Sequence, residues 1–305
     1  MCVIGIDTSK YTTSIACFDG QQGHNCSKML PVQAGQLGLR QSDAVFSHIK
    51  SLPELSGRLF SHVQNIQAVG VSTRPRAVEG SYMPCFLVGY SHAVVLSQAL
   101  GVPLVEVSHQ QGHVAAALWS AGHMELMDEP HLAWHLSGGT TELLLVEPEG
   151  KNVACTKIGG TTDISAGQLI DRTGQLLGLP FPSGKHLDAL SREAVDKQSF
   201  RVKCSDSYFS LSGVQNKVQQ YHAQCQNPAE TSAYALRCIS TAVTQATKQA
   251  QQRYPGLRVV FSGGVASNTL LREKLAPLSP IFAPPEYSTD NAMGVAVLTQ
   301  RLMEG

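Results

Sequence analysis

The sequence predicts an α/β protein made of two similar halves. Short runs rich in β-forming residues alternate along the chain with longer helical runs, which is typical of α/β folds. Two segments, residues 3–18 and 132–146, each place a polar turn between two β-rich runs, and they lie about half a chain apart. The 305 residues are 43% hydrophobic and 15% charged, which is enough for two domains with apolar cores.

The first half opens on a predicted hairpin, with strands at residues 3–6 and 14–18 around a polar turn. Three elements follow, a strand at 68–72, a helix at 86–100 that ends at Gly101, and a strand at 104–107. Ser108 has the character of a helix N-cap, and Gln111 stands at the capping-box position. A helix over residues 109–119 is therefore expected.

The second half opens on the second predicted hairpin, whose strands at residues 132–136 and 142–146 flank a glycine-rich turn. Helices are expected at residues 164–177 and 231–253, and a strand at 257–261. That strand leads through Ser262, Gly263 and Gly264 into a helix near Ser267. The proline-rich residues 277–285 connect to a last helix that begins near Asp290.

The composition excludes several classes of protein. The formal net charge is zero, so no field of the whole protein attracts nucleic acid, and a nucleic-acid partner needs a local basic patch or a helper subunit. The eight cysteines form no C-x-x-C pair, which argues against a zinc ribbon or a thioredoxin-like site. No apolar run approaches the roughly 20 residues that span a bilayer. These features predict a soluble cytoplasmic protein.

Two histidines are candidate metal ligands. His109 and His113 are four residues apart on a predicted helix, so both imidazoles share one face and could bind one divalent ion. Their segment lacks the glutamate of H-E-x-x-H, which argues against a metalloprotease. Asp290, at a helix start, and His135, at a strand end, are candidate further ligands. Each also has a purely structural interpretation, as a helix cap or a hydrogen-bonded core histidine.

Two glycine turns are candidate phosphate sites. The turn at Ser137, Gly138 and Gly139 offers backbone N–H groups and hydroxyls to an anion. The turn at residues 262–268 joins a buried strand to a helix N-terminus, where the helix dipole favours an anion. Neither turn fits the P-loop pattern. Asp171 and Asp188 are candidates for binding ribose hydroxyls, with solvated surface carboxylates as the alternative.

These motifs, in this order, resemble the TsaD-type tRNA threonylcarbamoyltransferases, which belong to the actin-like ATPase superfamily. The resemblance covers nearly the whole chain. The segments that carry it, by their first and last residues, are Gly5 to Ser9 (G-I-D-T-S), Gly38 to Arg58, His109 to His113 (H-Q-Q-G-H), Ser137 to Thr141 (S-G-G-T-T), Asp171 to Pro182, Phe209 to Gly213 (F-S-L-S-G), Gly263 to Asn268 (G-G-V-A-S-N) and Thr289 to Ala292 (T-D-N-A).

The resemblance implies two actin-like domains with a central cleft, residues 1–120 with 276–305 and residues 121–275. It implies transfer of a threonylcarbamoyl group from threonylcarbamoyl-AMP to the N6 amine of the adenosine just after the anticodon of tRNA. TsaB-like and TsaE-like proteins are the implied partners. One iron or zinc ion would be held by His109, His113 and Asp290, with His135 where some members have a tyrosine ligand. The implied adenylate-binding residues are His135, Leu136, Ser137, Gly138, Gly139, Asp171, Gly184, Asp188 and Asn268.

Three loops depart from the family pattern, and they leave alternatives open. Two acidic residues are replaced in Lys10-Tyr11-Thr12, a G-P-G loop is replaced by Arg74-Pro75-Arg76, and Thr140 stands where the family has histidine. One alternative is a divergent paralogue acting on another carbamoyl or phosphoryl substrate. Another is a non-catalytic subunit that binds a nucleotide and a partner. Lys197, Arg201, Lys203 and Lys217 are either a basic face or scattered surface charges.

Overall fold

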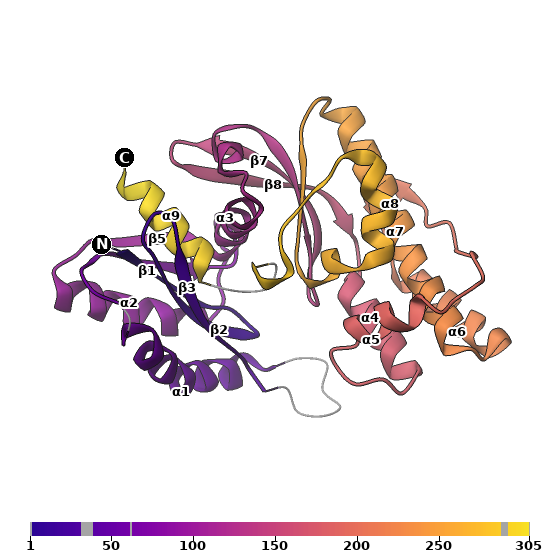
Figure 1. The fold of residues 1–305 in the computed structure, drawn as a ribbon, viewed down its shortest axis with the longest axis horizontal. Coiled ribbons are helices and arrows are strands. Elements are labelled where there is room, and N and C mark those ends of the chain that lie inside the picture. The colour runs from indigo at the N-terminus through magenta and orange to yellow at the C-terminus, as the bar shows by residue number, and fades with distance from the viewer. Residues whose placement is uncertain (1, 32–38, 62, 288–291, 305) are drawn as a thin grey trace. The chain divides into compact units, whose positions relative to one another are not determined.

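The chain forms two compact units in a computed structural model that describes residues 2–31, 39–61, 63–287 and 292–304. Unit 1 comprises Met1–Glu129, Glu147–Cys155 and Asp290–Gly305, and unit 2 comprises Pro130–Val146 and Thr156–Thr289. Each unit has its own sheet (Figure 1). The domain boundaries expected from the sequence stay a prediction.

The sheet of unit 1 has five strands in the order β3-β2-β1-β4-β5. They are β1 (Cys2–Thr8), β2 (Thr12–Phe18), β3 (Gly23–Met29), β4 (Ile66–Arg74) and β5 (Leu104–Ser108). β1 runs antiparallel to β2 and parallel to β4. Helices α1 (Gln41–Phe60) and α2 (Phe86–Leu100) pack against this sheet, and α9 (Met293–Met303) packs against both the sheet and α3 (His109–Ala121).

The sheet of unit 2 has the order β12-β11-β6-β7-β8-β10-β9. Its strands are β6 (His131–Leu136), β7 (Thr141–Glu149), β8 (Asn152–Thr161), β9 (Cys204–Ser205), β10 (Tyr208–Phe209), β11 (Val259–Ser262) and β12 (Ile281–Phe282). Its helices are α4 (Ala166–Leu176), α5 (Gly184–Ser191), α6 (Ser212–Cys225), α7 (Pro228–Arg253) and α8 (Thr269–Leu275). The core centres on Trp134, which lies at 0% exposure and donates from Nε1 to Thr247 Oγ1 at 2.9 Å.

The two sheets repeat one pattern, as the paired hairpins predict. In each unit a first strand pairs antiparallel with the second and parallel with a later strand, as β1 does with β2 and β4, and β6 with β7 and β11. The strand order β3-β2-β1-β4-β5 matches β8-β7-β6-β11-β12. The expected α/β fold with a duplicated unit is confirmed.

Most predicted elements are present, with shifted ends. Helix α2 has the expected bounds and ends at Gly101, which has a left-handed φ of 66°. Helix α7 begins three residues earlier than expected, because Asn227 caps it and Pro228 occupies its first turn. Helix α1, which is 20 residues long and contains Pro53, was not expected from the sequence.

All eight cysteines are free, and five of them are buried. Among the residues that the structure describes, no helix combines the length and the apolar character needed to span a membrane.

Candidate functional site

A buried carboxylate stands at the carboxyl end of β1. Asp7 is at 0% exposure, and its Oδ1 accepts hydrogen bonds from His109 Nδ1, at 2.9 Å, and from the hydroxyl of Ser72 on β4. Its Oδ2 has no hydrogen-bond partner within the described ranges. Because Asp7 accepts from Nδ1, the proton of the His109 ring is held on that nitrogen, and the lone pair of Nε2 is left to face outward from the carboxylate.

The lone pair of His109 points at a second imidazole. His113 Nε2 lies 2.9 Å from His109 Nε2, and the ring centroids are 4.3 Å apart. Two ring nitrogens bound to one tetrahedral ion at about 2.0–2.1 Å each would lie about 3.3–3.4 Å apart, slightly farther than these two nitrogens. The expected convergence of the two histidines on one face of a helix is present in the structure.

Helix α3 fixes the direction of both histidines. Ser108 caps it, and the capping box with Gln111 expected from the sequence is confirmed. Gln111 also donates from Nε2 to the carbonyl of Val153 at 2.8 Å, which secures the first turn. At the next residue, Gly112, α3 meets α9 so closely that a Cβ on Gly294 would overlap the Gly112 carbonyl. The two helix backbones can approach this closely because neither glycine carries a side chain.

Of the other two predicted metal ligands, one lies outside the described residues and the other belongs to the other unit. Asp290 lies outside the described residues, just before α9. His135 belongs to unit 2, where its Nδ1 is 3.5 Å from Ser262 Oγ. Within the described ranges, no group of three or more histidine, cysteine, aspartate or glutamate side chains is gathered in a way that could hold a metal ion.

The two glycine turns meet at neighbouring strand ends in unit 2. β6 and β11 are parallel, with His135 opposite Ser262, so the turns that follow them are adjacent. Ser262 donates from Oγ to the carbonyl of Trp134 at 3.1 Å. Gly263 has a φ of 92°, and a Cβ there would overlap the backbone of Leu136. Only glycine combines this φ with such a close approach.

The first residues of α4 hold the turn at 137–141. Ser165, the N-cap of α4, donates from Oγ to the carbonyl of Gly138 at 2.7 Å, and the N–H of Ala166 donates to Thr141 Oγ1 at 2.8 Å. Gly167 follows, where a Cβ would lie 2.5 Å from the carbonyl oxygen of Ser137 and 2.9 Å from the Gly138 nitrogen. The turn therefore depends on a small residue in α4.

Gly167→Ala is expected to displace this turn. The added methyl group must push the backbone of the turn away, at a cost of about 1–3 kcal/mol. If half of that cost opposes nucleotide binding, the affinity for an adenine nucleotide decreases by roughly two- to tenfold. Calorimetric titration with ATP checks this, with Gly213→Ala as the matched control, because a Cβ on Gly213 meets open space. Equal affinities for the two variants would contradict the role given to Gly167.

The predicted ribose-binding carboxylates are each engaged by nearby backbone. Asp171 on α4 accepts from the N–H of Ser183 at 2.9 Å, directly before Gly184. Burial raises the pKa of Asp171, although this hydrogen bond lowers it in part. The structure thus brings Asp171 and Gly184 together.

Asp188 and Asn268 are also brought together. Asp188 Oδ1 accepts from Asn268 Nδ2 at 2.7 Å and from the N–H of Thr269 at 2.9 Å. Its Oδ2 accepts from Thr269 Oγ1 at 2.8 Å and from Arg192 at 2.9 Å. Asn268 in turn caps α8 through its Oδ1. Asp188 therefore fixes the orientation of the Asn268 amide.

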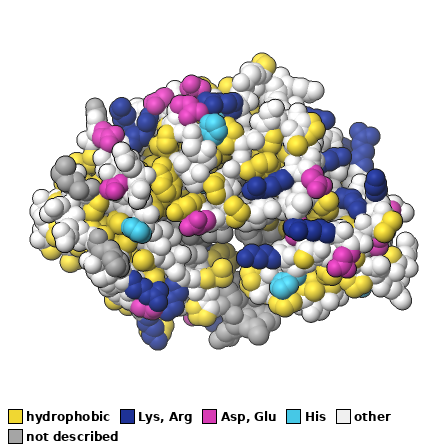
Figure 2. All heavy atoms as spheres, viewed as in Figure 1, with side chains coloured by type: hydrophobic (Ala, Val, Ile, Leu, Met, Phe, Trp, Pro, Cys, Tyr) yellow, Lys and Arg dark blue, Asp and Glu magenta, His cyan; other side chains and the backbone are white. Residues whose placement is uncertain are grey.

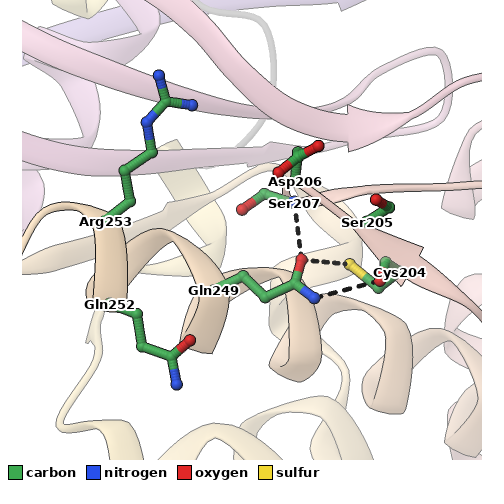
Figure 3. A pocket seen from close by; sticks show the side chains of 7 residues that line it. All are labelled: Cys204, Ser205, Asp206, Ser207, Gln249, Gln252 and Arg253. Carbon is green, nitrogen blue, oxygen red and sulfur yellow. Dashed lines mark hydrogen bonds between the residues drawn. The ribbon is translucent and has the colours of Figure 1, made fainter.

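A polar pocket of about 490 Å³ lies elsewhere in unit 2 and contains none of the predicted site residues (Figure 3). Gln249 crosses it, with Oε1 accepting from the N–H of Ser207 at 2.8 Å and Nε2 donating to the carbonyl of Cys204 at 3.2 Å. Burial raises the pKa of the Cys204 thiol to about 11. In unit 1, burial and the nearby charge of Asp7 raise the pKa of Cys85 to about 12. Both thiols are protonated at neutral pH, so neither acts as a nucleophile.

Sequence reasoning missed the residues that support the predicted ones. The sequence indicates Asp7 only as part of a resembling motif, and Ser72, Ser165 and Gly167 only as members of a predicted strand and helix. The capping pattern of Ser165 and Gln168 was the one local signal, since it forms a capping box at the start of α4. Nothing in the local sequence indicates that Asp7 contacts a histidine 102 residues away.

The amino-acid sequence of the chain matches a family of known proteins. The family model described as "TsaD: tRNA N6-adenosine threonylcarbamoyltransferase" matches residues 42–297. A curated protein of that name from Thermosipho africanus is 30% identical over 323 residues, which cover 99% of this chain and 94% of the relative. Another of that name, from Streptococcus suis, is 32% identical over 247 residues, covering 77% of this chain and 70% of the relative.

Solved structures share the fold at low identity. HypF from T. kodakarensis aligns with a TM-score of 0.63 and 13% identity over 100% of this chain, and the chain spans about half (48%) of that protein. A ROK family glucokinase from Streptomyces griseus aligns with a TM-score of 0.56 and 11% identity over the full length of both chains. These neighbours are actin-like proteins, and the expected actin-like fold is confirmed.

Proposed function

The chain belongs to the family of tRNA N6-adenosine threonylcarbamoyltransferases, and from this membership we propose how its two units divide the reaction. The protein is a transferase that places a threonylcarbamoyl group on the N6 amine of an adenosine in tRNA. The match favours this activity over a non-catalytic subunit or another small substrate. We propose that the donor is threonylcarbamoyl-AMP and that the acceptor is the adenosine just after the anticodon.

Unit 1 is proposed to hold one divalent iron or zinc ion. His109 and His113 are the ligands with direct structural support, because their Nε2 atoms are 2.9 Å apart and Asp7 keeps the proton of His109 on Nδ1. Neutral imidazole nitrogens suit both metals. Asp290, also in unit 1, is the proposed third ligand. His135, the further ligand that the resemblance implies, belongs to unit 2 and stays a prediction. When bound, such an ion polarises a carbonyl as a Lewis acid.

Unit 2 is proposed to bind the adenylate. The turn after β6 presents backbone N–H groups and a hydroxyl to the phosphate through residues 135–139, and the turn after β11 lies beside it. Asp171, beside Gly184, would accept a ribose hydroxyl. Asn268, held by Asp188, would meet the nucleotide with the remaining N–H of its amide. These assignments rest on the hydrogen bonds that already orient each side chain.

The family reaction makes two demands on these residues. The N6 amine of adenosine is a weak nucleophile because its lone pair is delocalised into the ring, so the carbonyl must be made more electrophilic. The amine and carbonyl must also be held in contact, and alignment contributes several kcal/mol out of an ideal of about 7–11 kcal/mol. A base in the anticodon loop is accessible for this, since single-stranded RNA presents its base edges.

The cellular setting follows from the same membership. We propose that the protein works in the cytoplasm, where tRNA is modified, with TsaB-like and TsaE-like partner subunits. The altered segments Lys10-Tyr11-Thr12 and Arg74-Pro75-Arg76 lie in unit 1, after β1 and at the end of β4. They are the places where this chain would differ from other members in its handling of the transferred group.

A reconstituted reaction tests the proposal. The full chain is combined with its partner subunits, the adenylate-forming enzyme, ATP, threonine, bicarbonate and unmodified tRNA. Nucleoside mass spectrometry is expected to detect threonylcarbamoyladenosine, and omission of the chain should remove it. A complete reaction without this nucleoside, with adenine nucleotide still bound by the protein, would show that the acyl substrate is a different one.

A further inference from the structure

The zero net charge of the chain conceals two units of opposite charge. Unit 2 contains 14 lysines and arginines and 10 acidic residues, a formal charge of +4. Unit 1 contains 9 lysines and arginines and 13 acidic residues, a formal charge of −4. On the face drawn in Figure 2, many of the Lys and Arg side chains gather where α4 to α8 are drawn in Figure 1. A polyanionic partner is therefore attracted to unit 2 rather than to the whole protein.

One loop of unit 2 and the helix beside it carry four exposed cations, one of which lies over an aromatic ring. Lys197, Arg201 and Lys203 are exposed on the loop before β9, and Lys217 on α6 places its Nζ over the ring of Phe200, 5.8 Å from the centroid. The Phe200 side chain is 38% exposed. We call these five residues the loop patch. The four charges that the sequence left as a basic face or as scattered charges thus belong to one loop and the helix beside it.

The backbone of this loop is fastened to the helices beneath it. The N–H of Phe200 contacts Cys238 Sγ on α7 at 3.1 Å, and Arg237 donates to the carbonyl of Gln198 at 3.5 Å. Val202 is buried in the core at 3% exposure, so its neighbours Arg201 and Lys203 both point outward. Contacts with α7 therefore hold the backbone of the patch, and its charged side chains are exposed to solvent.

The nearby carboxylates are occupied by internal hydrogen bonds. Glu230 accepts from the N–H groups of Val195 and Asp196, at 2.8 and 3.2 Å from its Oε1. Asp196 accepts from the hydroxyl of Tyr221 at 2.8 Å. Within the described ranges, none of the four cations of the loop patch forms an ion pair with a carboxylate. Their charges are therefore available to an external partner.

We propose that the loop patch binds the phosphate backbone of the tRNA substrate. Exposed Lys and Arg side chains neutralise phosphates, and an exposed aromatic ring among them can stack on an unpaired base. The patch lies on the unit that carries the proposed adenylate residues, and Arg172, next to Asp171, donates to Gln215 on α6 at 2.7 Å. This inference rests on the proposed function, because it names the surface that holds the tRNA for that reaction.

Binding of unmodified tRNA to the full chain, measured by fluorescence anisotropy across about 50–200 mM salt, tests the patch. A variant with Lys197, Arg201, Lys203 and Lys217 all replaced by Ala is expected to bind at least about tenfold more weakly at the lowest salt. The slope of log affinity against log salt concentration should be smaller in magnitude by about 3–4, since each phosphate contact contributes about one to this slope. Phe200→Ala should weaken binding about tenfold without changing the slope.

A matched variant removes four other exposed lysines, Lys50, Lys151, Lys248 and Lys274, and is expected to keep the wild-type slope. If the variant with all four cations replaced loses ATP binding, the single changes Arg201→Ala and Lys217→Ala are used in its place. Each is expected to reduce the steepness of the salt dependence by about one. The patch variants could bind tRNA with the slope and affinity of the wild type while the wild type still forms threonylcarbamoyladenosine. That result would refute the proposed role of the loop patch but not the proposed function. A wild type that neither binds nor modifies tRNA would overturn both.

Discussion

Removing a proposed metal ligand is expected to abolish both metal binding and transfer. His113→Ala deletes one of the two ring nitrogens that face each other, and Asp290→Ala deletes the proposed third ligand. An ion that polarises a carbonyl lowers the barrier by several kcal/mol, so its loss slows transfer by about a thousandfold or more. Elemental analysis of the purified protein should give well under one metal ion per chain. Nucleoside mass spectrometry should show little threonylcarbamoyladenosine.

The control for these ligand changes is His24→Ala. His24 is exposed on β3 of the same unit and is not among the proposed ligands. This variant should keep a full complement of metal and full activity. One metal ion per chain in His113→Ala would refute the assignment of His113, and the same result in Asp290→Ala would refute that of Asp290. The two ligands are thus tested separately.

Asp7→Asn is expected to weaken metal binding by about 10–100-fold, because Asp7 acts through His109 rather than on the ion itself. The substitution keeps the shape of the side chain and an oxygen acceptor, but it removes the negative charge that holds the proton on His109 Nδ1. With that charge gone, the tautomer that presents a bare Nε2 is less favoured, and the ring is a weaker ligand. Transfer should decrease in parallel and recover in part when excess metal is added.

Competition with a chelator measures this affinity directly. Asp43→Asn is the matched control, since Asp43 lies in the first turn of α1 in the same unit. Ser72→Ala removes the other hydrogen bond to Asp7 Oδ1 while keeping the charge, so it should have a smaller effect. A metal affinity in Asp7→Asn equal to that of wild type would mean that Asp7 has only a structural role.

Local patterns were sufficient for much of the fold. The β-rich runs of the two hairpins, the left-handed Gly101 after α2 and the capping box at Ser108 depend on residues close together in the chain. Such signals are present in the sequence whatever the rest of the chain does. Helix α1 was missed because Pro53 interrupts its pattern, and packing against β2 and β3 stabilises it instead.

For the site, the sequence alone determined which residue types are candidates, and in which order they occur. The spacing of His109 and His113 fixed their shared face, because four residues make about one helical turn. The order of motifs along the chain identified the family. The charges of the loop patch were visible in the sequence, but the contact of Lys217 with the Phe200 ring was not.

Only the tertiary structure decided which distant groups meet. It set Asp7 against His109, Ser165 against the turn at Gly138, and Asp188 against Asn268, pairs that are separated by 102, 27 and 80 residues. Such contacts follow from how strands are ordered in a sheet and how helices pack on it, and no local propensity encodes that order. The sequence determines the type of each side chain, whereas the folding of the whole unit determines which side chains it contacts.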